Sequence, residues 1–333
     1  MIDLHLHLDG SLNPKNIVTM AKMAGVELPY TEEDVIRTKM MVEPDCTNLG
    51  EYLEKFDLPL QLLQTTECIE YAVYELVRDL KEQGLCYAEI RYAPQLHLQK
   101  GLTQDEVVAA TIRGRNKAIE DFGMTVNLIL CCMRSDQNHA ENMETVRMGE
   151  KYLGQGVCAV DLAGNEAAYP TETFRDIFEL AVEKKVPVII HAGEAAGPES
   201  MWSALELGAV RIGHGIHAIE DTELMKVLKE KSIFLEMCYS SNLQTKTVDR
   251  AEDYPILKFM DAGLRITLNT DNLTVSNTAL QREYRIIQKQ IGLSDDQLKQ
   301  AALNSVDASF ASEDEKVQLK AQIENGFTNW LYA

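Results

Sequence analysis

The first residues of the chain alternate apolar side chains with side chains that can bind metal or transfer protons. In residues 2–9, Ile-Asp-Leu-His-Leu-His-Leu-Asp, every even position is apolar. A period of two is typical of a β-strand, so Asp3, His5, His7 and Asp9 are expected on one face. Two imidazoles spaced in this way lie side by side and can bind one cation. Because an isolated His-x-His pair is more often a solvated strand edge, the rest of the sequence has to decide.

Histidine and acidic residues also follow several other short apolar runs. His191 ends one run and Glu194 comes three residues later, His214 ends a second run between two glycines, and Asp271 follows a third. The 161–166 segment, Asp-Leu-Ala-Gly-Asn-Glu, ends a fourth. Read alone, His191 would be a core histidine bonded to a carbonyl. Its place at a strand end, opposite a His-x-His strand, favours a metal ligand instead.

These residues can meet only if the elements that carry them are brought together. The chain alternates short apolar runs with helix-length stretches such as 171–183 and 222–231, which predicts parallel strands joined by helices. Eight runs over this length favour a (β/α)8 TIM-type barrel in one domain, residues 1–333, over an open doubly wound sheet. The expected strands are the segment from residue 2, then 85–91, 125–131, 157–162, 186–190, 209–212, 233–237 and 264–268.

In such a barrel the carboxyl ends of all strands form one crater, where enzymes of this fold place their sites. His5, His7, His191 and Asp271 would converge there, and imidazole with carboxylate suits zinc, with iron, cobalt or manganese as alternatives. A bound water would have its pKa lowered to roughly 7 and become a nucleophile. Glu194 is read as a general acid or base beside the metal, or else as a carboxylate stabilised at a helix N-terminus.

The two remaining polar candidates have roles that follow from this arrangement. His214 could orient the attacking oxygen or stabilise its charge, and Asp271 could accept a proton from water as well as bind metal.

Residues 14–80 are mostly helical in pattern, with breaks near 25–29 and 44–48. Within them Leu49, Tyr52, Leu53 and Phe56 are spaced as one helix face, which periodicity alone assigns to the core.

Composition narrows the class of partner. The chain has 32 basic and 52 acidic residues, a net charge of −20, which argues against nucleic acids and anionic membranes. No stretch has the length of a membrane span, and the N-terminus lacks the pattern of a signal peptide. The seven cysteines form no Cys-x-x-Cys pair, so free thiols in a cytoplasmic protein are expected. Oligomeric state is left open.

Five motifs, taken together and in order, resemble the signatures of the adenosine deaminase family. The resemblance runs from residue 2 to about residue 310. It implies a metal-dependent hydrolase barrel, with additional N-terminal helices over the mouth of the site and one Zn²⁺ bound by His5, His7, His191 and Asp271. The motifs are His5-Leu-His7-Leu-Asp9-Gly10, Asp161-Leu-Ala-Gly164-Asn-Glu166, His191-Ala-Gly-Glu194, Arg211-Ile-Gly-His214-Gly and Asn269-Thr-Asp271.

The resemblance also implies a reaction, the hydrolytic deamination of adenosine, and of 2′-deoxyadenosine, to the inosine product and ammonia. Glu194 would protonate purine N1 while hydroxide adds to C6, steered by His214 and Asp271. Only a neutral carboxylic acid can donate this proton, and a desolvated pocket raises the pKa of Glu194 in the required direction. The expected substrate-binding residues are His7, Asp9 at the ribose 5′-hydroxyl, Gly164 at N3, Asn272 at N7, and Leu49, Tyr52, Leu53 and Phe56 around the ribose.

Two positions depart from the family pattern. Asn272 stands where many members have aspartate, and Tyr239 replaces the proline of Cys-Pro-x-Ser-Asn, which we expect to loosen that loop. The alternatives are a deaminase of adenine or of a larger nucleoside such as aminodeoxyfutalosine, and a catalytically silent purine-binding barrel. A dinuclear hydrolase is disfavoured because the fourth strand ends in Asp161-Leu-Ala-Gly164, without a lysine. A cytidine-deaminase zinc motif is absent from the sequence.

Overall fold

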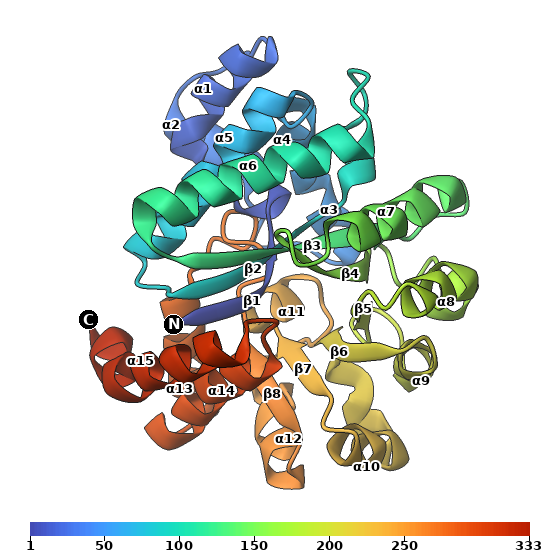
Figure 1. Cartoon of the computed structure of the whole chain (residues 1–333). Coiled ribbons are helices and arrows are strands. Elements are labelled where there is room, and N and C mark those ends of the chain that lie inside the picture. The colour runs from blue at the N-terminus through green and yellow to red at the C-terminus, as the bar shows by residue number, and fades with distance from the viewer.

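The computed structural model describes all residues, 1–333, and contains eight strands in one sheet with the spatial order of the sequence, β1 to β8. Every neighbouring pair is parallel. Helices alternate with the strands and surround them (Figure 1). The strands are β1 Ile2–His7, β2 Tyr87–Tyr92, β3 Thr125–Met133, β4 Val157–Ala163, β5 Val188–Ala192, β6 Ala209–His214, β7 Phe234–Met237 and β8 Arg265–Leu268.

The sheet closes just beyond the end of β8. Asp271 donates its backbone N–H to the carbonyl of His5 at 2.8 Å and accepts from the N–H of His7 at 2.8 Å, forming a parallel bridge to β1. This closure confirms the (β/α)8 barrel and excludes the open sheet. It also places the backbone of one predicted metal ligand directly beside two others.

The long connection between β1 and β2 is helical, as predicted. Its first part holds α1 and α2, and a second part packs over the carboxyl ends of the strands. The elements are η1 Asp9–Ser11, α1 Pro14–Ala24, α2 Glu33–Met40, α3 Leu49–Leu53, η2 Glu54–Phe56, α4 Asp57–Leu62 and α5 Thr66–Glu82.

The longer of the remaining helices form the outer ring, and the last three pack together beside β8 and β1. No helix is both long enough and apolar enough to cross a membrane. The other elements are η3 Pro94–His97, α6 Gln104–Phe122, α7 His139–Tyr152, η4 Thr171–Phe174, α8 Arg175–Glu183, α9 Pro198–Glu206, η5 Ile216–Glu220, α10 Thr222–Glu230, α11 Tyr239–Gln244, η6 Ala251–Asp253, α12 Ile256–Ala262, α13 Leu280–Ile291, α14 Asp295–Ala308 and α15 Glu313–Tyr332.

The apolar core lies between the strands and the helices, whereas part of the barrel interior is charged. Leu4 and Leu6 join a cluster of 83 buried apolar residues. Inside the barrel, Arg91 contacts Glu236 at 2.8 Å, and Arg211 contacts the other oxygen of Glu236 at 2.7 Å. Buried charges are tolerated when they are paired. The Arg91–Glu236 pair joins β2 to β7 across the barrel, and the Arg211–Glu236 pair joins the neighbouring strands β6 and β7.

The alternation along β1 holds for fewer residues than predicted. Asp3 and His5 are fully buried, but the strand ends at His7, and Asp9 begins the short 3₁₀ helix η1. The shared strand face therefore does not include Asp9. Two other strands end later than predicted. β5 and β6 were expected to end at residues 190 and 212, but they include His191 and His214.

Candidate active site

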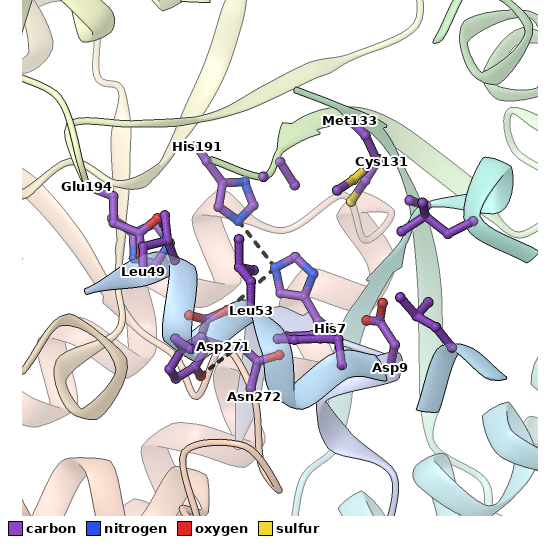
Figure 2. Close-up of a pocket in the computed structure, with 18 residues that line it drawn as sticks. His7, Asp9, Leu49, Leu53, Cys131, Met133, His191, Glu194, Asp271 and Asn272 are labelled. Carbon is purple, nitrogen blue, oxygen red and sulfur yellow. Dashed lines mark hydrogen bonds and ion pairs between the residues drawn. The ribbon is translucent and has the colours of Figure 1, made fainter. Parts of the chain in front are cut away.

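A cavity of about 200 Å³ opens at the carboxyl ends of the strands, beneath α3 and η2 (Figure 2). All the predicted site residues line it except His5, which is fully buried below. Glu194 and Asp9 lie on opposite sides of His7, so the cavity runs between an acid at one end and an acid at the other. Six further lining residues were not predicted: Leu60, Ala93, Leu96, Cys131, Met133 and Ala163.

Donor atoms of the four predicted metal ligands approach one another in pairs, at distances close to those between ligands of one small cation. The Nε2 atoms of His7 and His191 are 3.2 Å apart, and Oδ1 of Asp271 is 3.4 Å from Nε2 of His7 and 3.5 Å from that of His5. Ligands at tetrahedral zinc, with bonds of roughly 2.0–2.1 Å, are about 3.3 Å from one another. Nε2 of His5 is buried and has no hydrogen-bond partner. The donor set therefore fits zinc.

Two of the three histidines, and Asp271, have protonation states that favour metal binding. For His5, burial and the charge of Arg91 act to lower the pKa, but hydrogen bonds to Asp271 and Glu236 raise it above its usual value. Burial lowers the pKa of His7 and of His191, and the charge of neighbouring imidazoles lowers it further, so both stay neutral. Burial would raise the pKa of Asp271, but its hydrogen bond and charge interaction with His5, and the charges of His214 and His7, hold it well below the usual value. Neutral imidazoles beside an ionised carboxylate are the ligand forms that bind a divalent cation.

Two carboxylates orient the histidines from beneath. Glu236 Oε2 lies 2.8 Å from Nδ1 of His5, and Asp161 Oδ2 lies 2.9 Å from Nδ1 of His191. A carboxylate at Nδ1 keeps the ring proton there and leaves Nε2 free to bind metal. Asp161 belongs to a motif noted in the sequence, whereas the role of Glu236 was missed. Its signal was an acid inside the otherwise apolar run 233–237, because a carboxylate buried in a strand needs a partner.

Two additional donor atoms lie near the same point. His214 groups with His5 and His191, and Cys238 groups with His5 and Asp271, each with donor atoms within 4.8 Å of one another. Burial raises the pKa of Cys238 well above its usual value, with the charge of Asp271 acting in the same direction, so it is a thiol.

The ring of His214 is held with its Nε2–H facing the cavity. The amide nitrogen of Asn242 lies 3.0 Å from Nδ1, and the Asn242 oxygen accepts from the Tyr254 hydroxyl at 3.2 Å. Because the amide donates to Nδ1, a neutral His214 carries its proton on Nε2, which lies 3.6 Å from Glu194. His214 is therefore a donor toward the cavity. Both His214 and Asp271 have φ of 62°, a left-handed conformation that clusters at functional sites.

Glu194 follows β5 and presents a buried carboxyl group to the cavity. Burial raises its pKa well above the usual value, and the negative charges of Asp271 and Glu166 raise it further, against the opposing charge of Arg134. This shift favours the protonated, neutral form of the side chain. A neutral acid beside a candidate metal centre can donate a proton to a substrate nitrogen.

Two further predicted residues that line the cavity are Asp9 and Gly164. Oδ1 of Asp9 is buried without a partner, and burial raises the pKa of Asp9 to about 6. Gly164 has φ of +107°, and a Cβ there would lie 3.3 Å from the backbone nitrogen of Arg134. A glycine at this position leaves the backbone open to a ligand.

The structure also shows where the predicted apolar helix face lies, and where the two residues that depart from the family pattern, Asn272 and Tyr239, are placed. The face is divided between α3 and η2, and Tyr52 is not purely apolar: its hydroxyl accepts from the Asn272 amide at 3.0 Å and pairs with Ser276 at 2.6 Å. Oδ1 of Asn272 has no partner. Tyr239 begins helix α11 and bonds Gln290, so the expected loosening of this segment is not observed.

Comparison with known proteins connects this chain to one family. The model of the family described as "Adenosine deaminase" matches residues 1–326. The chain belongs to the adenosine deaminase family. A protein named adenosine deaminase from Haemophilus ducreyi is 48% identical over 331 residues, covering 98% of this chain and 96% of the relative. One from Enterococcus faecalis is 41% identical over 328 residues, with 98% and 96% covered.

Solved structures of deaminases share the fold over the full chain. An adenine deaminase from Arthrobacter aurescens has a TM-score of 0.88 at 27% identity, covering 100% of this chain and 99% of its own. An Arabidopsis ADAL in complex with GMP has a TM-score of 0.84 at 25% identity, with 98% and 96% covered. Barrels of this fold are therefore found with more than one purine substrate or ligand, and residues at the site must decide which one this chain accepts.

Proposed function

We propose that this protein hydrolyses adenosine to inosine and ammonia, using one zinc ion bound by His5, His7, His191 and Asp271. One observation carries the proposal. The imidazoles of His7 and His191 and the carboxylate of Asp271 line one cavity with Glu194, a buried carboxyl group whose pKa is held well above its usual value. This combination can activate water and protonate a purine ring together.

Zinc at this centre would lower the pKa of a water molecule and make it a nucleophile for purine C6. Glu194 donates its proton to N1, which draws electrons from C6 and opens it to attack. The Nε2–H of His214 hydrogen-bonds to the attacking oxygen, and the Asp271 carboxylate takes the first proton that the water loses. When the C6–N bond breaks, that proton leaves with ammonia, and the remaining hydroxyl proton restores Glu194.

The side chains around the cavity orient the purine for this reaction. The backbone N–H of Gly164 can meet N3, and Asn272 keeps one amide hydrogen for N7 while the other bonds Tyr52. The Asp9 carboxylate accepts from the ribose 5′-hydroxyl, beside His7. Leu49, Leu53 and Phe56 line the apolar wall of the cavity and cover the ribose.

The charge of the lining favours a nucleoside over a nucleotide. No lysine or arginine lines the cavity, and the ribose end carries the Asp9 carboxylate. A 5′-phosphate there would place two anions together in a buried site without a compensating cation. We therefore expect selection against 5′-phosphates, in contrast to the GMP-bound relative. No contact expected from the site involves the 2′-hydroxyl, so we propose that 2′-deoxyadenosine is also a substrate.

All seven cysteines are free thiols, six of them buried, which supports our proposal that the protein works in a reducing compartment, the cytoplasm.

The substrate proposal is tested by initial rates on adenosine, 2′-deoxyadenosine, adenine and AMP, followed by ultraviolet absorbance and ammonia release. We expect similar kcat/KM on the two nucleosides and values at least 100-fold lower on adenine and AMP. Preference for adenine would assign this chain to the activity named for the Arthrobacter aurescens structure. Absence of ammonia release from every compound by zinc-loaded protein would favour a silent purine-binding barrel.

A further inference from the structure

The carboxylate of Glu166 is surrounded by donors from the loop that follows β5. Glu166 is 1% exposed and accepts hydrogen bonds from four consecutive backbone amides. A fifth donor is the hydroxyl of Ser200, on α9. The four amides are Gly193 at 2.8 Å, Glu194 at 2.9 Å, Ala195 at 2.7 Å and Ala196 at 3.1 Å.

Four consecutive N–H groups that point at one anion make a backbone nest. Only a carboxylate has enough acceptor sites for all of them, since an amide side chain has one oxygen and would turn an NH₂ group toward N–H donors. Without Glu166 these buried amides would lose their partners, at a cost of about 1–3 kcal/mol for each unsatisfied group. The path of residues 193–196 therefore depends on this one side chain.

The loop held in this way carries the proposed general acid. Glu166 bonds the N–H of Glu194 itself and those of both flanking residues, while the Glu194 side chain lines the cavity. Gly193 turns the chain with φ of +71°, and a Cβ there would lie 2.6 Å from the sulfur of Met201. The backbone is thus held at Glu194 and at the residues before and after it. Glu166 itself does not line the cavity.

We propose that Glu166 is the positioning residue for Glu194, holding its carboxyl group at the height of purine N1. The inference rests on the proposed function, because it assigns Glu166 a role through the general acid of that reaction. Glu166 has no hydrogen bond to a predicted metal ligand and does not line the cavity, so its hydrogen bonds act on Glu194 through the loop. Its charge also raises the pKa of Glu194.

The first test replaces Glu166 with glutamine, which keeps the side-chain shape. We expect kcat on adenosine to fall about 100-fold, the order of loss that a misplacement near 1 Å causes. KM, inosine affinity and zinc content should stay within threefold of wild type. Glu199→Gln is the matched control: Glu199 is an exposed glutamate that accepts one N–H from the neighbouring Gly197. Its kcat should stay within threefold.

The second test asks whether the effect passes through Glu194. In a Glu194→Gln background, adding Glu166→Gln should lower kcat less than threefold, because there is no acid left to misplace. Independent roles would multiply the two losses. If Glu166→Gln does not fold, Glu166→Asp keeps the charge with a shorter reach, and we expect about a 10-fold loss of kcat at unchanged KM.

Three results would overturn the inference: wild-type kcat in folded Glu166→Gln, a loss of zinc proportional to the loss of kcat, or multiplicative losses in the double variant. Each is distinct from failure of the proposed function. If zinc-loaded wild type does not deaminate adenosine, the function is wrong. If wild type is active and Glu166→Gln equals it, only the role of Glu166 is wrong.

Discussion

Nδ1 of His5 lies 2.8 Å from Oε2 of Glu236, and both side chains are fully buried inside the barrel. Arg91 contacts the same carboxylate oxygen at 2.8 Å, and Arg211 contacts the other at 2.7 Å. The two guanidinium groups hold the pKa of Glu236 well below its usual value, against the effect of burial, so Glu236 is ionised. A fixed carboxylate then holds the ring of His5 with Nε2 directed at the candidate metal centre.

Glu236→Gln should weaken zinc binding by roughly 10–100-fold, because partners that orient metal-bound histidines contribute about this much. Competition with a chromophoric chelator measures the zinc Kd directly. Glu75→Gln is the control: Glu75 is also buried and paired with an arginine, but it lies on α5, away from every histidine of the site. Equal zinc Kd values for Glu236→Gln and wild type would show that Glu236 serves the barrel and not the metal.

Glu194 sets the alkaline limit of activity in this account. It donates only while protonated, so kcat should fall as pH rises through its pKa, which burial and the charges of Asp271 and Glu166 hold above the usual range. Glu194→Gln should lower kcat about 10²–10⁴-fold with little change in KM. The residual kcat of Glu194→Gln should not show the fall at high pH that wild type shows. A wild-type pH profile retained in Glu194→Gln would assign that limb to another group.

Asn242 controls which nitrogen of His214 carries the proton. Asn242→Asp replaces the donor at Nδ1 by an acceptor, so Nε2 loses its hydrogen in the neutral ring. We expect kcat to fall about 10²–10³-fold, as when one donor to a developing negative charge is removed. KM should be unchanged. Tyr254→Phe, which removes only the hydroxyl bonded to the Asn242 oxygen, should stay within fivefold of wild type. Similar losses in both variants would indicate general disturbance of the loop.

Asp9 is expected to bind the ribose 5′-hydroxyl. Asp9→Ala should raise KM for adenosine roughly 10–100-fold, the effect of losing a hydrogen bond to a charged group of about 1.5–3 kcal/mol. The matched experiment uses 5′-deoxyadenosine, which lacks that hydroxyl. With this substrate, wild type and Asp9→Ala should have KM values within threefold. A loss of equal size on both substrates would place Asp9 elsewhere in the mechanism.

The sequence predicted features that depend on local periodicity. Alternation identified β1, and reactive residues at strand ends located His191, His214 and Asp271 together, because parallel strands in a barrel bring their carboxyl ends to one place. Strand ends shifted by a few residues, and Asp9 left the strand for η1. That the chain is a single domain, and the roles given to the site residues, stay predictions.

What the sequence did not predict depends on contacts between distant segments. Glu236 meets His5 across 231 residues, and the Tyr52 hydroxyl meets Asn272 across 220. The local sequence pattern placed Glu236 on a strand and Tyr52 on an apolar helix face. Such a pattern does not specify which distant residue each side chain contacts. The carboxylate of Glu166 accepts hydrogen bonds from four backbone amides 27 to 30 residues away. These hydrogen bonds depend on the conformation of the loop, which the sequence pattern does not show.

The most direct test is to titrate metal-free protein with Zn²⁺ while following the conversion of adenosine to inosine by ultraviolet absorbance. We predict no turnover without metal, a linear rise in rate to one zinc per chain, and a plateau thereafter. Full activity in the metal-free protein, or none at one zinc per chain, would contradict the account of a single-zinc adenosine deaminase.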